Sequence, residues 1–179
     1  MSTGLVDDSR SRKIACRTRP ARTPRQPADD HAYVVIMNVL LVIHIMATWF
    51  MVGLIWTIQV VHYPLFQRVG AASFPSYEAE HTRRMGWLLA GPASLEVSTA
   101  GALVWFRPTA VGLGLVLTAG VILAGLWVTT ALRQVPLHRQ LTTAPTTAAI
   151  RRLVDSNWFR TAGWTLRGIL VSTMLLQVI

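Results

Sequence analysis

The side chains best suited to chemistry in this sequence follow its first long apolar stretch. The segment TIQVVHYPLF, residues 57–66, contains Gln59, His62 and Tyr63. Imidazole changes charge near neutral pH and is the commonest metal ligand in proteins, so His62 could move a proton or bind a metal ion. The segment is therefore either one wall of a functional site or only the polar end of a helix.

Two further histidines lie at comparable points of the chain, His81 before the second apolar stretch and His138 after the third. If each stretch forms a helix and successive helices are antiparallel, these segments meet at one end of a bundle. We therefore predict that His62, His81 and His138 lie together. The other polar residues expected at that end are Gln59, Tyr63, Glu78, Glu80, Arg84, Gln134, Asn157 and Arg160.

The three histidines are also candidate ligands for zinc, copper or iron, with a nearby glutamate completing the set. The spacing matches no specific template, because the sequence has no H-E-x-x-H motif, no C-x-x-C motif and no pair of E-x-x-H motifs. Histidines at the end of a bundle can instead meet lipid headgroups. Metal binding by His62, His81 and His138 is thus one hypothesis, and proton transfer is another.

Glu96 and Arg167 are single charges inside otherwise apolar segments. A charge at the centre of a bilayer costs at least about 2.5–3.5 kcal/mol, and both residues are expected at similar depth. We predict that they pair, either to fix the helices in register or to serve as acid/base and oxyanion-binding groups. His44 lies 18 positions before His62, roughly 27 Å along a helix at about 1.5 Å per residue, so we expect it near the opposite surface.

The composition indicates an integral membrane protein. Only 14% of the 179 residues are charged, against about 25% in ordinary soluble domains. Charge-free runs such as 31–67 and 108–132 approach or exceed the roughly 20 residues needed to span a bilayer, and the chain has room for four spans. We expect an all-α, multi-pass protein of the cell membrane. The net charge of +9 then indicates contact with anionic lipid, and we expect no nucleic-acid partner.

The expected organisation is a disordered basic tail, residues 1–32, followed by a four-helix transmembrane domain, residues 33–179. The first helix should begin at Tyr33 or Met37, where a second start codon could also lie, and end at Val61 because Pro64 follows. A short amphipathic helix should precede the second span. The remaining spans are expected at Arg84–Phe106, kinked at Pro92, Ala110–Leu132 and Trp158–Ile179, the last with Asn157 as its N-cap.

The C-terminal half resembles a known family of small four-helix membrane proteins. The segments TTALRQVPLHRQL and LVDSNWFRTAGWTLRGIL are similar to the anthrone-oxygenase-like family, with Pro136, Trp158, Arg160 and Thr161 as the clearest matches. The sequence departs from that family at His138, where asparagine is usual, and looks closer to its uncharacterised bacterial branch. The resemblance implies oxygenation of an aromatic, membrane-soluble substrate without haem or flavin.

Three functions follow from these features. In the first, the protein is an oxidoreductase or oxygenase for a small apolar or quinone-like molecule. There His62, His81 or His138 removes a proton, Glu96 acts as acid or base, and Arg160 and Arg167 stabilise negative charge. In the second, the same groups carry protons or a metal ion through an oligomer. In the third, the chain is a structural membrane subunit.

Overall fold

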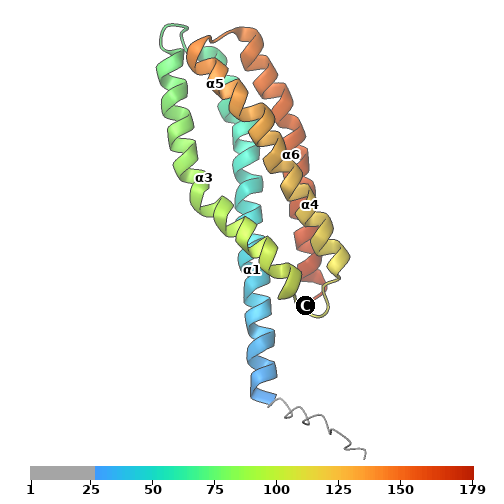
Figure 1. Cartoon of the computed structure of the whole chain (residues 1–179). Helices are drawn as coiled ribbons and strands as arrows, with labels where there is room; N and C mark the ends of the chain where they lie inside the picture. Colours follow the sequence, from blue (N-terminus) through green and yellow to red (C-terminus); the bar gives the residue numbers. More distant parts are fainter. Residues whose placement is uncertain (1–26) are drawn as a thin grey trace, which may run out of the picture.

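The computed structural model describes residues 27–179, with side chains from Asp30 onward. Four long helical rods run up and down in an all-helical bundle (Figure 1), and the described residues form no strands. Each rod packs against its neighbours, α1 against α3 and α6, and α4 against α3 and α6. The all-α, four-helix architecture expected from the sequence is confirmed.

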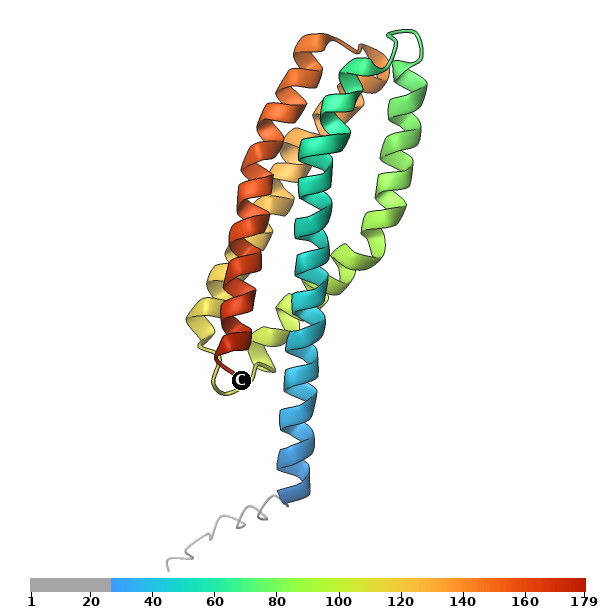
Figure 2. The same cartoon turned by 180° about the vertical axis from the view of Figure 1, so that it is seen from behind.

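The first rod is longer than expected at both ends. Helix α1 spans Pro27–Thr57 and continues through a π-helical turn (Ile58–His62), helix α2 (Tyr63–Leu65) and a 3₁₀ turn (Phe66–Arg68). Residues 27–32, which we expected in the tail, are therefore helical, and the start of α1 projects beyond the rest of the bundle (Figure 2). The remainder of the predicted tail lies outside the described residues. The prediction that Pro64 ends the helix at Val61 was wrong.

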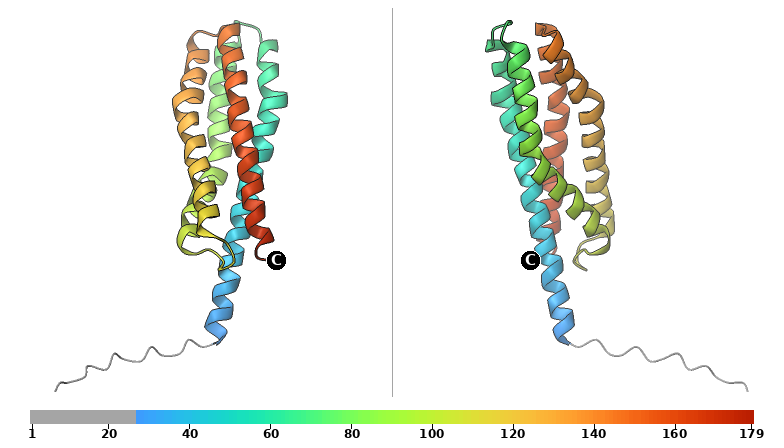
Figure 3. Two further views of the ribbon diagram at one scale, coloured as in Figure 1. Left: turned by 90° about the vertical axis from the view of Figure 1, so that its right-hand side faces the viewer. Right: turned by 60° about the vertical axis from the view of Figure 1, so that its left-hand side comes forward.

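The second rod is a single helix, α3 (Phe74–Trp105), instead of the two helices expected. Pro92 lies inside it, and α3 changes direction part-way along its length (Figure 3). Proline removes one backbone hydrogen bond and crowds the carbonyl four residues earlier, which explains a bend at this position.

The third rod extends past its expected C-terminal end and the fourth begins before its expected start, whereas their other ends fall three residues short. Helix α4 (Leu113–Thr129) continues through a π-helical turn (Thr130–Gln134) into α5 (Val135–Thr143). Helix α6 runs without a break over Thr147–Leu176, and its N-cap is Thr146, whose hydroxyl oxygen accepts a hydrogen bond from the amide of Ala149 (3.1 Å). Asn157 is therefore an interior residue of α6 and not its N-cap. Its side chain is buried and forms hydrogen bonds inside the bundle.

The two π-helical turns explain how prolines fit within continuous rods. In each, an amide bonds the carbonyl five residues earlier: Tyr63 to Ile58, and Val135 to Thr130. Each turn is followed by an X-Pro-Leu sequence that starts the next α-helix. The wider turn relieves the clash that a proline ring makes in a regular α-helix. Such turns are frequent at functional sites, and here they re-aim the chain just where the polar side chains begin.

Inside the bundle, apolar and polar layers alternate along the helix axes. Three clusters of buried apolar residues occupy the two ends and the middle. The middle cluster comprises Met51, Val52, Ile55, Leu123, Leu126 and Trp164. Along α1 it lies between Thr48 and Gln59, and along α6 between Arg160 and Arg167. The buried polar residues are consequently divided into two separate groups.

Three of the rods are long and apolar enough to cross a membrane, namely Asp30–Arg68, Phe74–Trp105 and Leu113–Thr143. Helix α6 is not among them, although a fourth span was expected. Arg160 and Arg167 lower its hydropathy, yet both side chains are buried in the bundle.

Candidate functional site

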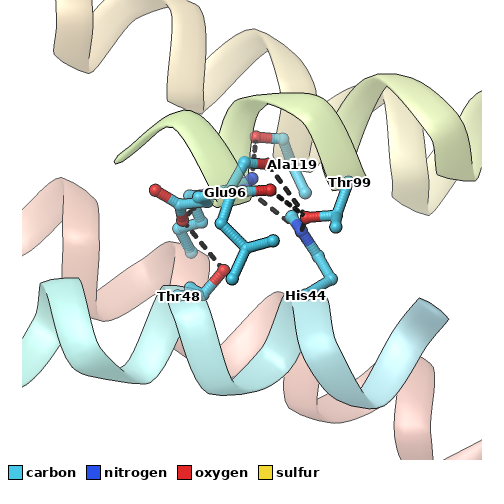
Figure 4. Close-up of polar contacts among 7 residues, drawn as sticks. His44, Thr48, Glu96, Thr99 and Ala119 are labelled. Carbon is cyan, nitrogen blue, oxygen red and sulfur yellow. Dashed lines mark hydrogen bonds and ion pairs between the residues drawn. The ribbon is translucent and has the colours of Figure 1, made fainter. Parts of the chain in front are cut away.

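The first polar group is the central network, which we define as His44, Thr48, Glu96, Thr99 and Arg167 (Figure 4). Arg167 donates from Nε to Oε1 of Glu96 (3.0 Å) and from Nη1 to the carbonyl of Ala119 (2.6 Å). The same Oε1 accepts a hydrogen bond from the hydroxyl of Thr48 (2.8 Å). The predicted contact between Glu96 and Arg167 is confirmed.

His44 completes the central network, which was not expected. Its Nε2 lies 3.0 Å from Nη2 of Arg167, and its Nδ1 lies 2.8 Å from the hydroxyl of Thr99. The prediction that His44 lies near the opposite surface was wrong because α1 begins at Pro27, which places His44 well inside the helix. His44 and Thr48 are one helical turn apart, so they share the face of α1 that looks toward α3 and α6.

The second polar group is the loop-side cluster, which we define as His62, Tyr63, Glu78, His81 and His138. Its centre is a chain of three side chains from three rods. Nδ1 of His138 bonds Oε1 of Glu78, and Nε2 of His138 lies 3.0 Å from the hydroxyl of Tyr63. With Glu78 ionised, Nδ1 carries the proton, so Nε2 accepts from the Tyr63 hydroxyl. A carboxylate thus orients an imidazole whose other nitrogen is basic, as in catalytic triads.

The other two histidines form a pair beside this chain. Nε2 of His62 lies 2.9 Å from Nδ1 of His81, and the ring of His81 is centred 5.5 Å from that of His138. His62 and His81 are both partly exposed. The predicted meeting of the three histidines is confirmed, and His138 is partly exposed like the other two.

Arg160 is held next to the cluster by a row of amides. Its Nη1 donates to Oδ1 of Asn157 (2.8 Å), whose Nδ2 donates to Oε1 of Gln59 (2.8 Å). Gln59 in turn donates to the carbonyl of Val154 (3.3 Å). The Nε of Arg160 is buried and has no hydrogen-bond partner among the described residues. The same holds for Oε2 of Glu78.

A cavity of about 360 Å³ opens beside these groups, mainly between α3 and the third rod, with Ile58 and Tyr63 of the first rod and Arg160 of α6 completing its wall. Ligand sites for small molecules usually measure about 300–1,000 Å³ and combine apolar walls with a few polar groups. This cavity has that character. Its polar lining includes Tyr63, His81, Gln134, His138 and Arg160, and its apolar lining includes Ile58, Met85, Leu89 and Val135.

The structure therefore divides the six residues predicted to carry chemistry. His62, His81, His138 and Arg160 belong to the loop side, whereas Glu96 and Arg167 belong to the central network, beyond the middle apolar layer. Sequence reasoning placed Tyr63 and Glu78 at the correct end, with Glu78 only as one of the glutamates, besides Glu80 and Glu96, that could complete a metal-ligand set. Glu78 could have been singled out by its phase, since it lies three residues before His81 on one helix face.

The metal hypothesis gains no support from this geometry. Within residues 30–179, no group of three or more His, Cys, Asp or Glu side chains is arranged to hold a metal ion. The nitrogens of His62, His81 and His138 instead bond one another, Tyr63 and Glu78. Metal binding by these histidines stays a prediction.

The described part of the chain is a four-helix bundle in which three of the rods are long and apolar enough to cross a membrane. No protein-family model matches the sequence, and no curated protein or solved structure is significantly similar to it.

Proposed function

We propose that the chain is a multi-pass protein of the cell membrane whose cavity binds a small apolar molecule and removes a proton from it. The support for membrane insertion is the distribution of side chains. The charges of Glu96 and Arg167 are fully buried, whereas large apolar residues such as Val121 and Leu132 are each 73% exposed. Exposed apolar surface of this extent marks contact with lipid or protein. Helix α6 spans as well, because its two arginines face inward.

The observation that carries the proposed activity is the Glu78–His138–Tyr63 chain at the wall of a largely apolar cavity. Glu78 orients His138 and stabilises the imidazolium that forms. A substrate takes the place of the Tyr63 hydroxyl at Nε2 of His138, which accepts its proton. The electron pair of the broken bond stays on the substrate as an enolate, and the freed Tyr63 hydroxyl donates to the enolate oxygen.

We assign the His62–His81 pair as the neighbouring acceptor for the abstracted proton, since the ring of His81 is centred 5.5 Å from that of His138. His81 lines the cavity, and its Nδ1 is bonded to the partly exposed His62 (2.9 Å). The resemblance to anthrone-oxygenase-like proteins extends the proposal: the deprotonated substrate is the species that dioxygen would oxidise. In this assignment the oxidoreductase hypothesis belongs to the loop side alone, and Glu96 and Arg167 hold the bundle together.

Proton or metal transport fits the structure less well, because the middle apolar layer separates the two polar groups. Met51, Leu126 and Trp164 of this layer are each 2–3% exposed. A conducting path would have to cross this packed layer, whose six buried residues include no ionisable side chain. The role of a structural subunit accounts for the central network but not for the cavity or for the unpartnered Nε of Arg160.

The activity is tested with anthrone, an apolar molecule whose C10 protons are acidified by a carbonyl. We expect the purified protein to catalyse deuterium exchange at C10, measured by NMR. His138→Gln should slow the exchange about 10²–10⁴-fold, the usual contribution of a general base. His31→Gln, an exposed change at the far end of α1, is the matched control. Equal rates for wild type and His138→Gln would disprove the proposed role of His138.

The cavity is tested independently with glycine substitutions. Gly86 lines the cavity, and a Cβ there would meet no atom within 4 Å, so Gly86→Leu should narrow the cavity without disturbing the helix. Gly101 on the same helix has equally open surroundings and lies outside the cavity lining. We expect Gly86→Leu to abolish anthrone exchange and Gly101→Leu to leave it unchanged. The opposite pattern would show that the cavity is not the site.

A further inference from the structure

Arg160 is a buried cation that lines the cavity and has no anionic partner in the described part of the chain. Arg160 as a whole residue is 9% exposed, and the ion pairs found within residues 30–179 do not include it. Its neighbours in the amide row, Asn157 and Gln59, are neutral. Arginine stays protonated in proteins. A positive charge is therefore held against an apolar cavity without compensation.

Such an arrangement is costly unless something supplies the missing charge. A buried charge is normally paired, because desolvation of an isolated ion costs several kcal/mol. Arg167, on the same helix, shows how this chain neutralises a buried guanidinium when the role is internal, since Glu96 is placed at 3.0 Å. No equivalent carboxylate is provided for Arg160 by the described residues.

The guanidinium is also held in place rather than left to move. Asn157 takes only Nη1, and its own side chain is fixed by Gln59. Nε is buried and without a partner among the described residues, and the side chain lines the cavity, so the guanidinium has N–H donors that Asn157 does not use. A carboxylate matches an arginine in both charge and donor geometry.

We propose that the ligand of this cavity is an apolar molecule bearing a carboxylate, which pairs with Arg160. This inference rests on the proposed ligand cavity but not on proton transfer by His138. The apolar body occupies the space beside Met85 and Leu89, and the carboxylate supplies the charge that the bundle lacks. Arg160 is then a specificity-determining residue: it selects acids over neutral molecules of the same shape.

The test compares two probes that differ only in charge, 2-naphthoate and its neutral isostere 2-naphthamide. Binding to the full chain in detergent is measured by titration calorimetry. We expect wild type to bind 2-naphthoate at least tenfold more tightly than 2-naphthamide. Arg160→Gln should abolish this preference, and Arg160→Lys should restore part of it, because lysine keeps the charge but lacks the bidentate fork. Equal binding of both probes to wild type would overturn the proposal.

Three further arms locate the effect and its source. Gly86→Leu should weaken both probes, whereas Gly101→Leu, which lies outside the cavity lining, should leave the preference for 2-naphthoate intact. Retention of the preference in folded Arg160→Gln would show that another residue recognises the charge and would overturn the proposal. Phosphatidic acid and a second aromatic acid are then compared as competitors of 2-naphthoate. Displacement by phosphatidic acid at the lower concentration would overturn the proposal in favour of a lipid phosphate.

Discussion

The bundle contains two buried glutamates, and comparing them shows how the same side chain is used in two ways. Glu96, in the central network, shares one oxygen between Arg167 (3.0 Å) and Thr48 (2.8 Å), and no cavity described above reaches it. Glu78, in the loop-side cluster, bonds a histidine that lines a cavity of about 360 Å³. Both carboxylates are fully buried. The difference is therefore access and not burial.

This difference indicates that strong polar contacts alone do not mark the functional site. The central network joins three helices and also reaches the carbonyl of Ala119 on the fourth, so it fixes the register of the whole bundle. The loop-side cluster and the adjacent Arg160 leave donors and acceptors unused, including Nε of Arg160 and Oε2 of Glu78. Although Oε2 of Glu96 is also unpartnered, it lies away from the cavity lining.

Charge reversal in the central network should produce the largest effect. Arg167→Glu places a second buried carboxylate next to Glu96 and removes three hydrogen bonds. Breaking a buried pair from one side costs about 3–5 kcal/mol before repulsion is added, which is comparable to the whole stability of many domains. We expect almost no monodisperse protein after detergent extraction, measured by size-exclusion chromatography.

The matched control is Arg151→Glu, which makes the same charge change at an exposed position of α6. It should extract like wild type. Normal yield and normal thermal stability for Arg167→Glu would show that the pair with Glu96 does not hold the bundle together.

Parallel glutamate-to-glutamine changes should separate the two regions most clearly. Glu96→Gln leaves the Arg167 charge unpaired, so we expect stability to fall by about 3–5 kcal/mol while the remaining folded protein exchanges anthrone protons at nearly the wild-type rate. Glu78→Gln removes the charge that orients His138 and should slow exchange by roughly 10²-fold, the lower end for general-base catalysis, with a smaller change in stability. The measurements are thermal unfolding and deuterium exchange on the same preparations.

The comparison would collapse if both variants lost stability and activity together. A slow exchange rate in folded Glu96→Gln would instead connect the central network to catalysis, as one of the sequence hypotheses held.

These two regions also differ in how far the sequence predicted them. Two opposite charges in apolar segments are costly unless they pair, so the pairing of Glu96 with Arg167 could be inferred from their similar depth. The position of His44 could not, because it depended on where α1 begins, and Pro27, a residue typical of the first position of a helix, was taken as part of the tail. The meeting of three histidines followed from antiparallel order.

The pairing within the loop-side cluster was beyond the sequence because of the π-helical turns. Each turn inserts an extra residue into the hydrogen-bond pattern and rotates everything after it. The helical phase of Tyr63 and His138 therefore cannot be read by counting 100° per residue through the turns at Ile58–His62 and Thr130–Gln134. Proline was taken as a stop signal, whereas the wider turn before it lets the rod continue.

The apolar layer between the two regions offers a smaller and more local prediction. At Gly163 of α6 an added Cβ would lie 2.7 Å from Cδ2 of the buried Leu126. Gly163→Ala should therefore push α6 from α4 and lower stability by about 1–3 kcal/mol, as overpacking usually does. Gly125 and Gly163 line the same surface hollow, but a Cβ added at Gly125 would meet no atom within 4 Å, so Gly125→Ala should be tolerated. Thermal unfolding in detergent measures both, and equal melting temperatures would show that the layer is not tightly packed there.

The smallest effect is expected where ion contacts are most numerous. Glu80 accepts hydrogen bonds from both Arg83 (2.8 and 2.7 Å) and Arg84 (2.5 Å), more charged partners than Glu96 has. These side chains are exposed, however, with 42% for Glu80 and 60% and 75% for the arginines. Surface ion pairs contribute little because water and salt screen them and because holding long side chains in place costs entropy. We expect Glu80→Gln to leave the melting temperature and the anthrone exchange rate unchanged at 0.15 M salt, in contrast to Glu78→Gln two positions away. A large loss in Glu80→Gln would mean that charge count matters more than burial and access in this bundle.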